Sequence, residues 1–135
     1  MYYAVGQGAV GIEIRKGDEK MQKLCEVIGC KETTWRCIAE RALLRTLEGG
    51  CSVPVGVWTD IIEGTNKLSM KAIVLSINGV QTVESSIVGT IDINQDAVDI
   101  GVQLANDLIS KGAKKILDEI NFEKISEVKN SGIVN

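Results

Sequence analysis

One cysteine, Cys51, stands where covalent chemistry has the best opportunity in this sequence. It follows the pair Gly49-Gly50, and Ser52 and Pro54 come directly after it. Helices commonly end at glycine, and serine and proline favour a stiff local turn, so we expect the thiol in a loop near the surface. A thiolate in such a loop can act as a nucleophile toward a small molecule.

The neighbours of Cys51 act on its pKa in opposite directions. Arg41 and Arg45 are four residues apart on a predicted helix, share one of its faces, and would lower the thiol pKa from about 8.5. The C-terminal end of the same helix carries partial negative charge and disfavours the thiolate. The residues alone leave two interpretations open: a reactive thiol, or a small half-buried loop cysteine beside arginines that only solvate a helix face.

The other cysteines, Cys25, Cys30 and Cys37, do not point to a metal site. Their spacing is irregular, no CxxC pair occurs, and the chain has no histidine. Without a secretory signal a disulfide framework is not expected either. We expect Cys25 and Cys37 to be small buried side chains. Cys25 shares a helical stripe with Met21, Leu24 and Ile28.

The run Gly6-Gln7-Gly8-Ala9-Val10-Gly11 matches the GxGxxG pattern of dinucleotide-binding proteins. That interpretation needs a strand before the glycines and a helix directly after them. Here an alternating, strand-like run continues to Arg15, and the first helix is expected only after Gly17. The pattern therefore favours a tight backbone bend that leads into a strand.

Periodicity predicts helices, strands and their ends along most of the chain. Apolar residues at spacings of three and four predict helices over 19–28, capped by Asp18, from Thr33 or Thr34 to Glu48, from Asn94 or Asp96 to Lys111, and over 113–120. Alternating or β-branched runs predict strands over Val10–Arg15, Val53–Ile62, Lys67–Ser76 and Gln81–Gly89. Asn78-Gly79 predicts a hairpin between the last two.

Composition narrows the class of protein. The 135 residues are 44% apolar and carry a net charge of −3. One domain with a mostly aliphatic core is expected, and neither nucleic acid nor a membrane is expected as a partner. No apolar run approaches the roughly 20 residues that span a bilayer, and the first residues do not form a signal peptide, so we expect a cytoplasmic protein.

The segment AERALLRTLEGGCSVPVG, at residues 39–56, resembles the cofactor-attachment segment of porphobilinogen deaminase (hydroxymethylbilane synthase). The run VGQGAVGIE at residues 5–13 is similar to the end of that family's second domain, and GAKKIL at residues 112–117 is similar to its last helix. The resemblance extends from about Tyr3 to about Ile120 and concerns only the C-terminal third of the family.

The resemblance implies a cofactor and an activity. In the family, the cysteine that matches Cys51 carries a dipyrromethane through a thioether, and Gly50 and Ser52 would be the flanking cofactor-binding residues. The family's enzymes are transferases of haem biosynthesis that join four porphobilinogen molecules into the tetrapyrrole hydroxymethylbilane. The dipyrromethane is their permanent primer, and the full-length enzyme is expected to be monomeric.

The same resemblance implies that catalytic residues are missing from this chain. The family's catalytic aspartate and most of its carboxylate-binding arginines lie in two preceding domains, which no stretch here matches. A substrate and cofactor rich in carboxylates need several guanidinium partners, and developing positive charge needs a carboxylate. We expect the chain to be inactive alone, as a truncated product, a fragment or one part of a split enzyme. The alternative is a non-catalytic small-molecule-binding or complementing domain.

The expected architecture is α+β, with a three-stranded antiparallel sheet packed against helices and an N-terminal strand from a preceding domain. Residues 1–16 are expected to be the tail end of that preceding domain. Residues 17–120 would form the cofactor-attachment domain, and 121–135 a mobile tail. The first strand has no hairpin partner nearby in the sequence, so we expect it to pair with strands outside this chain.

Overall fold

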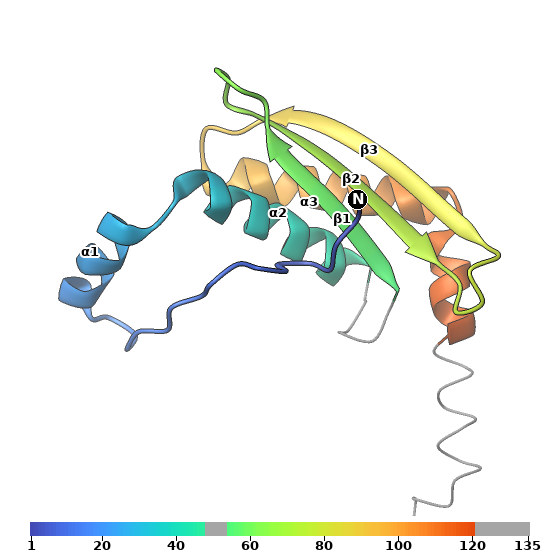
Figure 1. The fold of residues 1–135 in the computed structure, drawn as a ribbon, viewed down its shortest axis with the longest axis horizontal. Coiled ribbons are helices and arrows are strands. Elements are labelled where there is room, and N and C mark those ends of the chain that lie inside the picture. Colours follow the sequence, from blue (N-terminus) through green and yellow to red (C-terminus); the bar gives the residue numbers. More distant parts are fainter. Residues whose placement is uncertain (48–53, 121–135) are drawn as a thin grey trace, which may run out of the picture.

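A three-stranded antiparallel sheet forms one layer of the computed structural model, which describes residues 1–47 and 54–120 (Figure 1). Its strands are β1 (Val55–Ile61), β2 (Lys67–Leu75) and β3 (Thr82–Thr90), in that order across the sheet. Gly64 and Gly79 have positive φ values, 72° and 71°, in the two connections. The predicted meander and its Asn-Gly hairpin are therefore confirmed.

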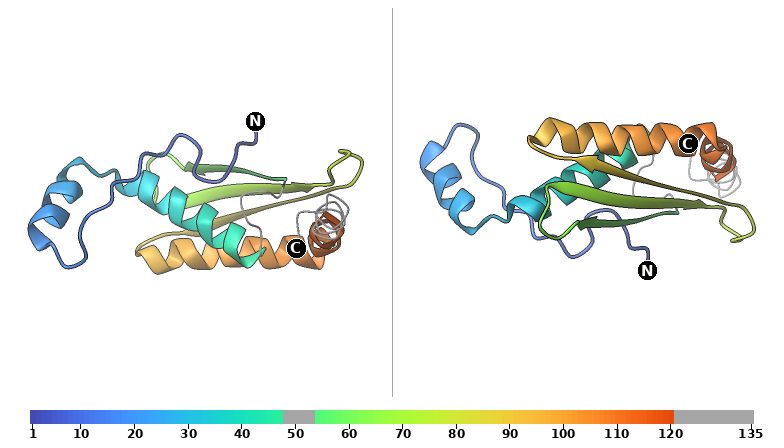
Figure 2. Two further views of the ribbon diagram at one scale, coloured as in Figure 1. Left: turned by 90° about the horizontal axis from the view of Figure 1, so that it is seen from below. Right: turned by 90° about the horizontal axis from the view of Figure 1, so that it is seen from above.

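Helices form the second layer. This layer consists of α2 (Lys31–Thr46) and α3 (Asn94–Ser110); α1 (Glu19–Ile28) and residues 113–120 are also helical. Figure 2 shows α2 and α3 crossing the same face of the sheet. The predicted α+β class is confirmed. One predicted boundary is wrong: α2 begins at Lys31, not after Thr33 or Thr34. The Thr34 hydroxyl donates to the Cys30 carbonyl (2.9 Å) inside the first turn, so it does not cap the helix.

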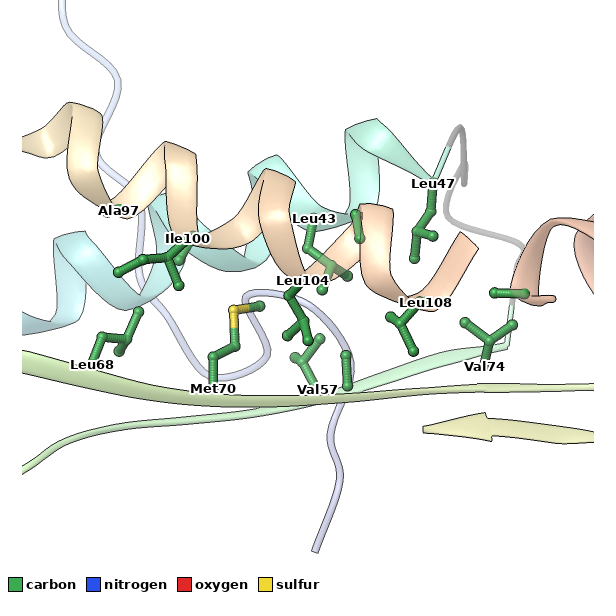
Figure 3. Packing of buried hydrophobic residues seen from close by; sticks show 14 of the residues in the cluster. Leu43, Leu47, Val57, Leu68, Met70, Val74, Ala97, Ile100, Leu104 and Leu108 are labelled. Carbon is green, nitrogen blue, oxygen red and sulfur yellow. The ribbon is translucent and has the colours of Figure 1, made fainter. Parts of the chain in front are cut away.

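The core lies between the layers and is mostly aliphatic, as predicted. Every second residue of β2 faces the helices, which explains the alternation in its sequence. In Figure 3, side chains from α2 and α3 point toward those of the sheet. The fully buried members include Leu43 from α2, Leu104 and Leu108 from α3, and Val57, Leu68, Met70 and Val74 from the sheet.

The backbones of α2 and α3 approach each other closely at Gly101. A Cβ atom at this position would lie 2.2 Å from the Ala39 carbonyl oxygen and 2.9 Å from the Ala42 Cβ. No real Cβ tolerates a carbonyl oxygen at that separation, so the helix pair requires glycine here. Both alanines are buried and small, which keeps the two axes close.

The strand predicted over Val10–Arg15 does not form. Residues 9–15 belong to neither a helix nor a strand, and Val10 and Ile12 are 92% and 57% exposed. The physical reason is the lack of a partner: within the described residues, the sheet contains only β1, β2 and β3. An alternating segment without a neighbouring strand has no ladder of hydrogen bonds to hold it.

Helix α1 forms with the predicted bounds but without the predicted buried face. The Asp18 carboxylate accepts from the Met21 backbone N–H (3.1 Å), and Gly29 closes the helix. No residue of α1 is buried, and Cys25 is half-buried against the expectation. Figure 1 shows α1 set apart from the sheet and from α3, so its apolar stripe meets solvent.

No helix in the described part of the chain is long and apolar enough to cross a membrane. The residues 121–135, for which a mobile tail is expected, lie outside the described residues.

Replacing Gly101 with alanine should destabilise the fold although alanine favours helix formation by about 1 kcal/mol. The new Cβ forces the helices apart, and we expect a net loss of about 1–3 kcal/mol in the free energy of unfolding, measured by urea denaturation. Asn106→Ala, at an exposed position of the same helix, is the matched control and should be neutral or slightly stabilising. Equal stability of Gly101→Ala and the wild type would contradict the close contact.

The Asp96 carboxylate should stabilise α3 only above acidic pH. It accepts from the backbone N–H groups of Ile93 (3.0 Å) and Asp92 (2.8 Å), and these bonds lower the Asp96 pKa below 3.8. A lowered folded-state pKa stabilises the fold above the unfolded value and loses that effect as the pH falls through the folded value. Asp96→Asn should therefore lower Tm at pH 7, and the difference in Tm should shrink as the pH falls through the folded-state pKa of Asp96. A pH-independent difference in Tm would contradict the assignment.

Candidate functional site

The predicted attachment residues Gly50, Cys51 and Ser52 lie in the 48–53 segment, outside the described residues. The elements on either side of this segment are well defined. Leu47 follows α2 and is buried in the core, and the Pro54 carbonyl accepts from the Leu75 backbone N–H (3.1 Å) just before β1 begins. The segment with Cys51 therefore joins the end of α2 to the first strand of the sheet.

Arg41 and Arg45 lie on the last two turns of α2, and both are exposed. Arg41 lines a groove, described next, whereas Arg45 does not. Among the described residues, the only ion pair joins Lys111 to Asp107, so neither guanidinium is committed to a carboxylate there. Two exposed cations ahead of Cys51 are compatible with both interpretations of these arginines given above, cations that act on the thiol and residues that only solvate a helix face.

A groove of about 1020 Å³ runs between residues 4–12, the C-terminal end of α1 and one side of α2. Its lining is mainly apolar, with Arg41 as its one basic side chain and three thiols on its walls. These thiols belong to Cys25, Cys30 and Cys37, the three described cysteines, and all are free. The groove is thus the place where the described cysteines meet.

The thiols differ in their readiness to ionise. Hydrogen bonds from the side chain and backbone of Thr33 lower the pKa of Cys30, which is exposed at the start of α2. Burial, reinforced by the charge of Glu40, raises the pKa of Cys37. Of Cys30 and Cys37, Cys30 therefore forms the thiolate, the nucleophilic form, more readily. In the ranges 1–47 and 54–120, no group of three histidine, cysteine or acidic side chains could hold a metal ion.

The glycine-rich run at the N-terminus forms a tight bend, as predicted. Gly6 and Gly8 have φ values of 68° and 80°, and the Gln7 and Ala9 amides donate back to Ala4 and Gly6 carbonyls. No helix follows the bend, so the geometry of a dinucleotide site is not present. The expected strand after the bend is also missing, as described above.

A buried polar cluster connects this bend to the fold, and sequence reasoning missed it. Glu40, a charged residue in the middle of α2, is only 3% exposed. Its carboxylate accepts from the Thr59 hydroxyl (2.5 Å), the Tyr3 hydroxyl (3.2 Å) and the Gly6 backbone N–H (2.8 Å). The available signal was its spacing: Glu40 lies three residues before Leu43 and seven before Leu47, which puts the three on neighbouring positions of one helix side.

Arg36 completes the cluster. Its Nε donates to the Thr59 hydroxyl (3.0 Å) and its Nη2 to the Tyr3 hydroxyl (3.3 Å). Burial lowers the pKa of Arg36, but the hydrogen bond to Tyr3 and the nearby Asp60 and Glu40 carboxylates outweigh it and raise the pKa overall. The cluster therefore places a stable cation beside the buried carboxylate.

Comparisons with known proteins agree on one family. Residues 34–110 match the family described as porphobilinogen deaminase, C-terminal domain. Proteins named porphobilinogen deaminase are similar over nearly all of the chain. The chain is 53% identical to one from Debaryomyces hansenii over 93% of its own length and 35% of the relative's, and 53% identical to one from Saccharomyces cerevisiae over 93% and 38%. It is 44% identical to one from Prochlorococcus marinus over 95% and 38%.

The matched range 34–110 covers most of α2, the whole sheet and α3, so the two-layer unit described above is the part that matches a family of named enzymes. The chain belongs to the porphobilinogen deaminase family and represents its C-terminal part. It spans little more than a third of the length of the curated relatives it matches.

Thr59 offers a sharp test of the buried cluster. Thr59→Val keeps the shape of the side chain but removes the hydroxyl that joins Glu40 to Arg36, and we expect it to lower the free energy of unfolding by about 1–3 kcal/mol. Thr59→Ser keeps the hydroxyl and should lose less. Chemical denaturation of both variants distinguishes the cases, and a serine variant as unstable as the valine variant would show that packing matters more than the hydrogen bonds.

Proposed function

We propose that this chain supplies the cofactor-attachment region of a porphobilinogen deaminase, with Cys51 as the anchor of a dipyrromethane cofactor. The observation that carries this proposal is family membership: Cys51 lies inside the 34–110 range that matches the family's C-terminal domain. Gly50 and Ser52, on either side of the thiol, are proposed as the adjoining cofactor-binding residues. The exposed cations Arg41 and Arg45 on α2 support an anionic ligand near this end of the helix.

In this proposal, the only chemical step that this chain performs is the covalent attachment of the cofactor. A thiolate is a soft nucleophile, and the C–S bond that it forms with carbon as a thioether is stable to hydrolysis. The dipyrromethane supplies a covalently held primer when bound. The residues of this chain would hold it: Cys51 through sulfur, and Arg41 and Arg45 through charge.

The reaction of the whole enzyme needs more than this chain contains. For the full-length family member we propose the joining of four porphobilinogen molecules into hydroxymethylbilane, a step of haem biosynthesis. The chain covers only 35% to 39% of its relatives, so the remaining groups would come from the part that precedes it in them. We propose that this chain alone is inactive.

The described structure supports a division of the chain that differs from the expected one. Residues 10–28 expose Ile12, Leu24 and Ile28 to solvent, and α1 buries nothing. The family match begins only at residue 34. We propose that residues 9–30 belong with a preceding unit and that the attachment domain proper starts near α2. This differs from the expected division into 1–16 and 17–120, because residues 3–8 pack on the sheet of this unit whereas α1 does not.

Intact mass tests the anchor directly. The chain is purified after co-expression with the N-terminal portion of the Saccharomyces cerevisiae relative, and separately on its own. An added mass of two linked pyrrole units is expected in the co-expressed chain and should be absent from Cys51→Ser. Cys30→Ser is the matched control, because Cys30 is an exposed thiol with a lowered pKa, and it should keep the added mass.

Each outcome of this experiment decides a point. Added mass that survives Cys51→Ser but disappears in Cys30→Ser would contradict the anchor at Cys51. An unmodified chain under both conditions would do so as well. Deaminase activity only in the mixture would identify a complementing domain. A tetrapyrrole that binds reversibly, with Cys51 unmodified, would favour the alternative of a small-molecule-binding module.

A further inference from the structure

The N-terminal residues cross the edge of the sheet as a strap, defined here as residues 3–8. The Tyr3 N–H donates to the Val57 carbonyl (2.9 Å), and the Val57 N–H donates to the Tyr3 carbonyl (2.8 Å). Tyr3 and Val5 pack against the core. The strap then turns at Gly6 and Gly8, and beyond it the chain leaves the two layers toward α1 (Figure 1).

The Glu40 carboxylate joins the strap to both layers. One oxygen accepts from the backbone N–H of Gly6 in the strap, at 2.8 Å. The other accepts from the Thr59 hydroxyl on β1 (2.5 Å) and from the Tyr3 hydroxyl (3.2 Å). A buried side chain on α2 thus contacts β1, a side chain of the strap and the backbone of its turn.

The donors of this cluster use both oxygens of the Glu40 carboxylate. The Tyr3 oxygen already accepts from the Thr59 N–H (2.9 Å) and from Arg36 (3.3 Å), and the Thr59 oxygen accepts from Arg36. The Thr59 hydroxyl proton and the Gly6 N–H go to the two different oxygens of Glu40, and the Tyr3 hydroxyl lies within hydrogen-bond reach of both Glu40 (3.2 Å) and the Thr59 oxygen (2.9 Å). An amide at position 40 has only one oxygen, so its NH2 group would face either the Gly6 N–H or the Thr59 hydroxyl.

We propose that Glu40 is a positioning residue: its carboxylate latches the strap onto α2 and β1 and so sets the direction in which residues 9–30 leave this unit. The latch concerns this chain alone. Its consequence for assembly rests on the proposed function, in which residues 9–30 belong with a preceding unit. Arg41, the next residue on α2, lines the groove together with residues of the strap and residues 9–12. Opening the strap therefore also changes the lining of the groove that contains this cation.

Amide hydrogen exchange on the full 135-residue chain tests the latch. In Glu40→Gln, the amides of Tyr3, Gly6 and Val57 should exchange about tenfold faster or more, because the strap opens locally. The amides of Leu104 and Leu108 in α3 should keep their rates. Glu63→Gln, at an exposed turn position, is the matched control and should leave all five rates unchanged.

Two results would overturn the latch. Unchanged exchange in the strap would show that a carboxylate is not required. Equal acceleration in the strap and in α3 would show that Glu40 contributes only to global stability. If Glu40→Gln does not fold, Tyr3→Phe replaces it, since it removes one hydroxyl from the same cluster. The same local acceleration is expected there, and its absence overturns the proposal.

The link to assembly is measured separately. Exchange is repeated in the Cys51→Ser background, where the latch should behave identically whether or not Cys51 is an anchor. Loading of Glu40→Gln and Glu63→Gln is then compared by intact mass after co-expression. Reduced loading of Glu40→Gln alone is expected. If Glu40→Gln is loaded as fully as Glu63→Gln although its strap exchanges faster, the role of Glu40 in assembly is contradicted. The proposal that Glu40 holds the strap is then unaffected.

Discussion

The close approach of α3 to α2 at Gly101 is the constraint on which most of this structure depends. Because the two backbones nearly touch, both helices can lie on one face of a sheet of only three strands and still cover it. Leu43 then reaches the same core as Leu104 and Met70. A longer separation would leave the inward residues of β2 partly in water, at a cost that grows with the apolar area exposed.

Helix α2 consequently makes packing or hydrogen-bond contacts on three of its sides. One side packs against α3, another bears Leu43 and Leu47 in the core, and a third carries Glu40 and Arg36 into a polar cluster with β1. Buried charges are tolerated here because each polar atom finds a partner: among the described residues, no buried side-chain nitrogen or oxygen lacks a hydrogen bond. The helix that precedes Cys51 is therefore held by both apolar and polar contacts.

Periodicity predicted the sheet, its hairpin and the long helices, because each buries one face against a neighbour within this chain. The same rule failed at Val10–Arg15 and on α1, whose apolar residues have no neighbour here to cover them. Periodicity also did not single out Glu40, since a pattern of residue types does not show which polar atoms from distant segments will converge on a buried position. The attachment residues at 50–52 were predicted through a resemblance, and their geometry lies outside the described residues.

The uncovered apolar side chains of residues 10–28 have a consequence for the life of this polypeptide in a cell. Val10, Val27 and Ile28 are more than two-thirds exposed, and Ile12 and Leu24 are more than half exposed. Apolar surface of this kind promotes self-association and recognition by chaperones and proteases. The abundance of the chain would then depend on how quickly that surface is covered after synthesis, more than on the stability of the folded core beside it.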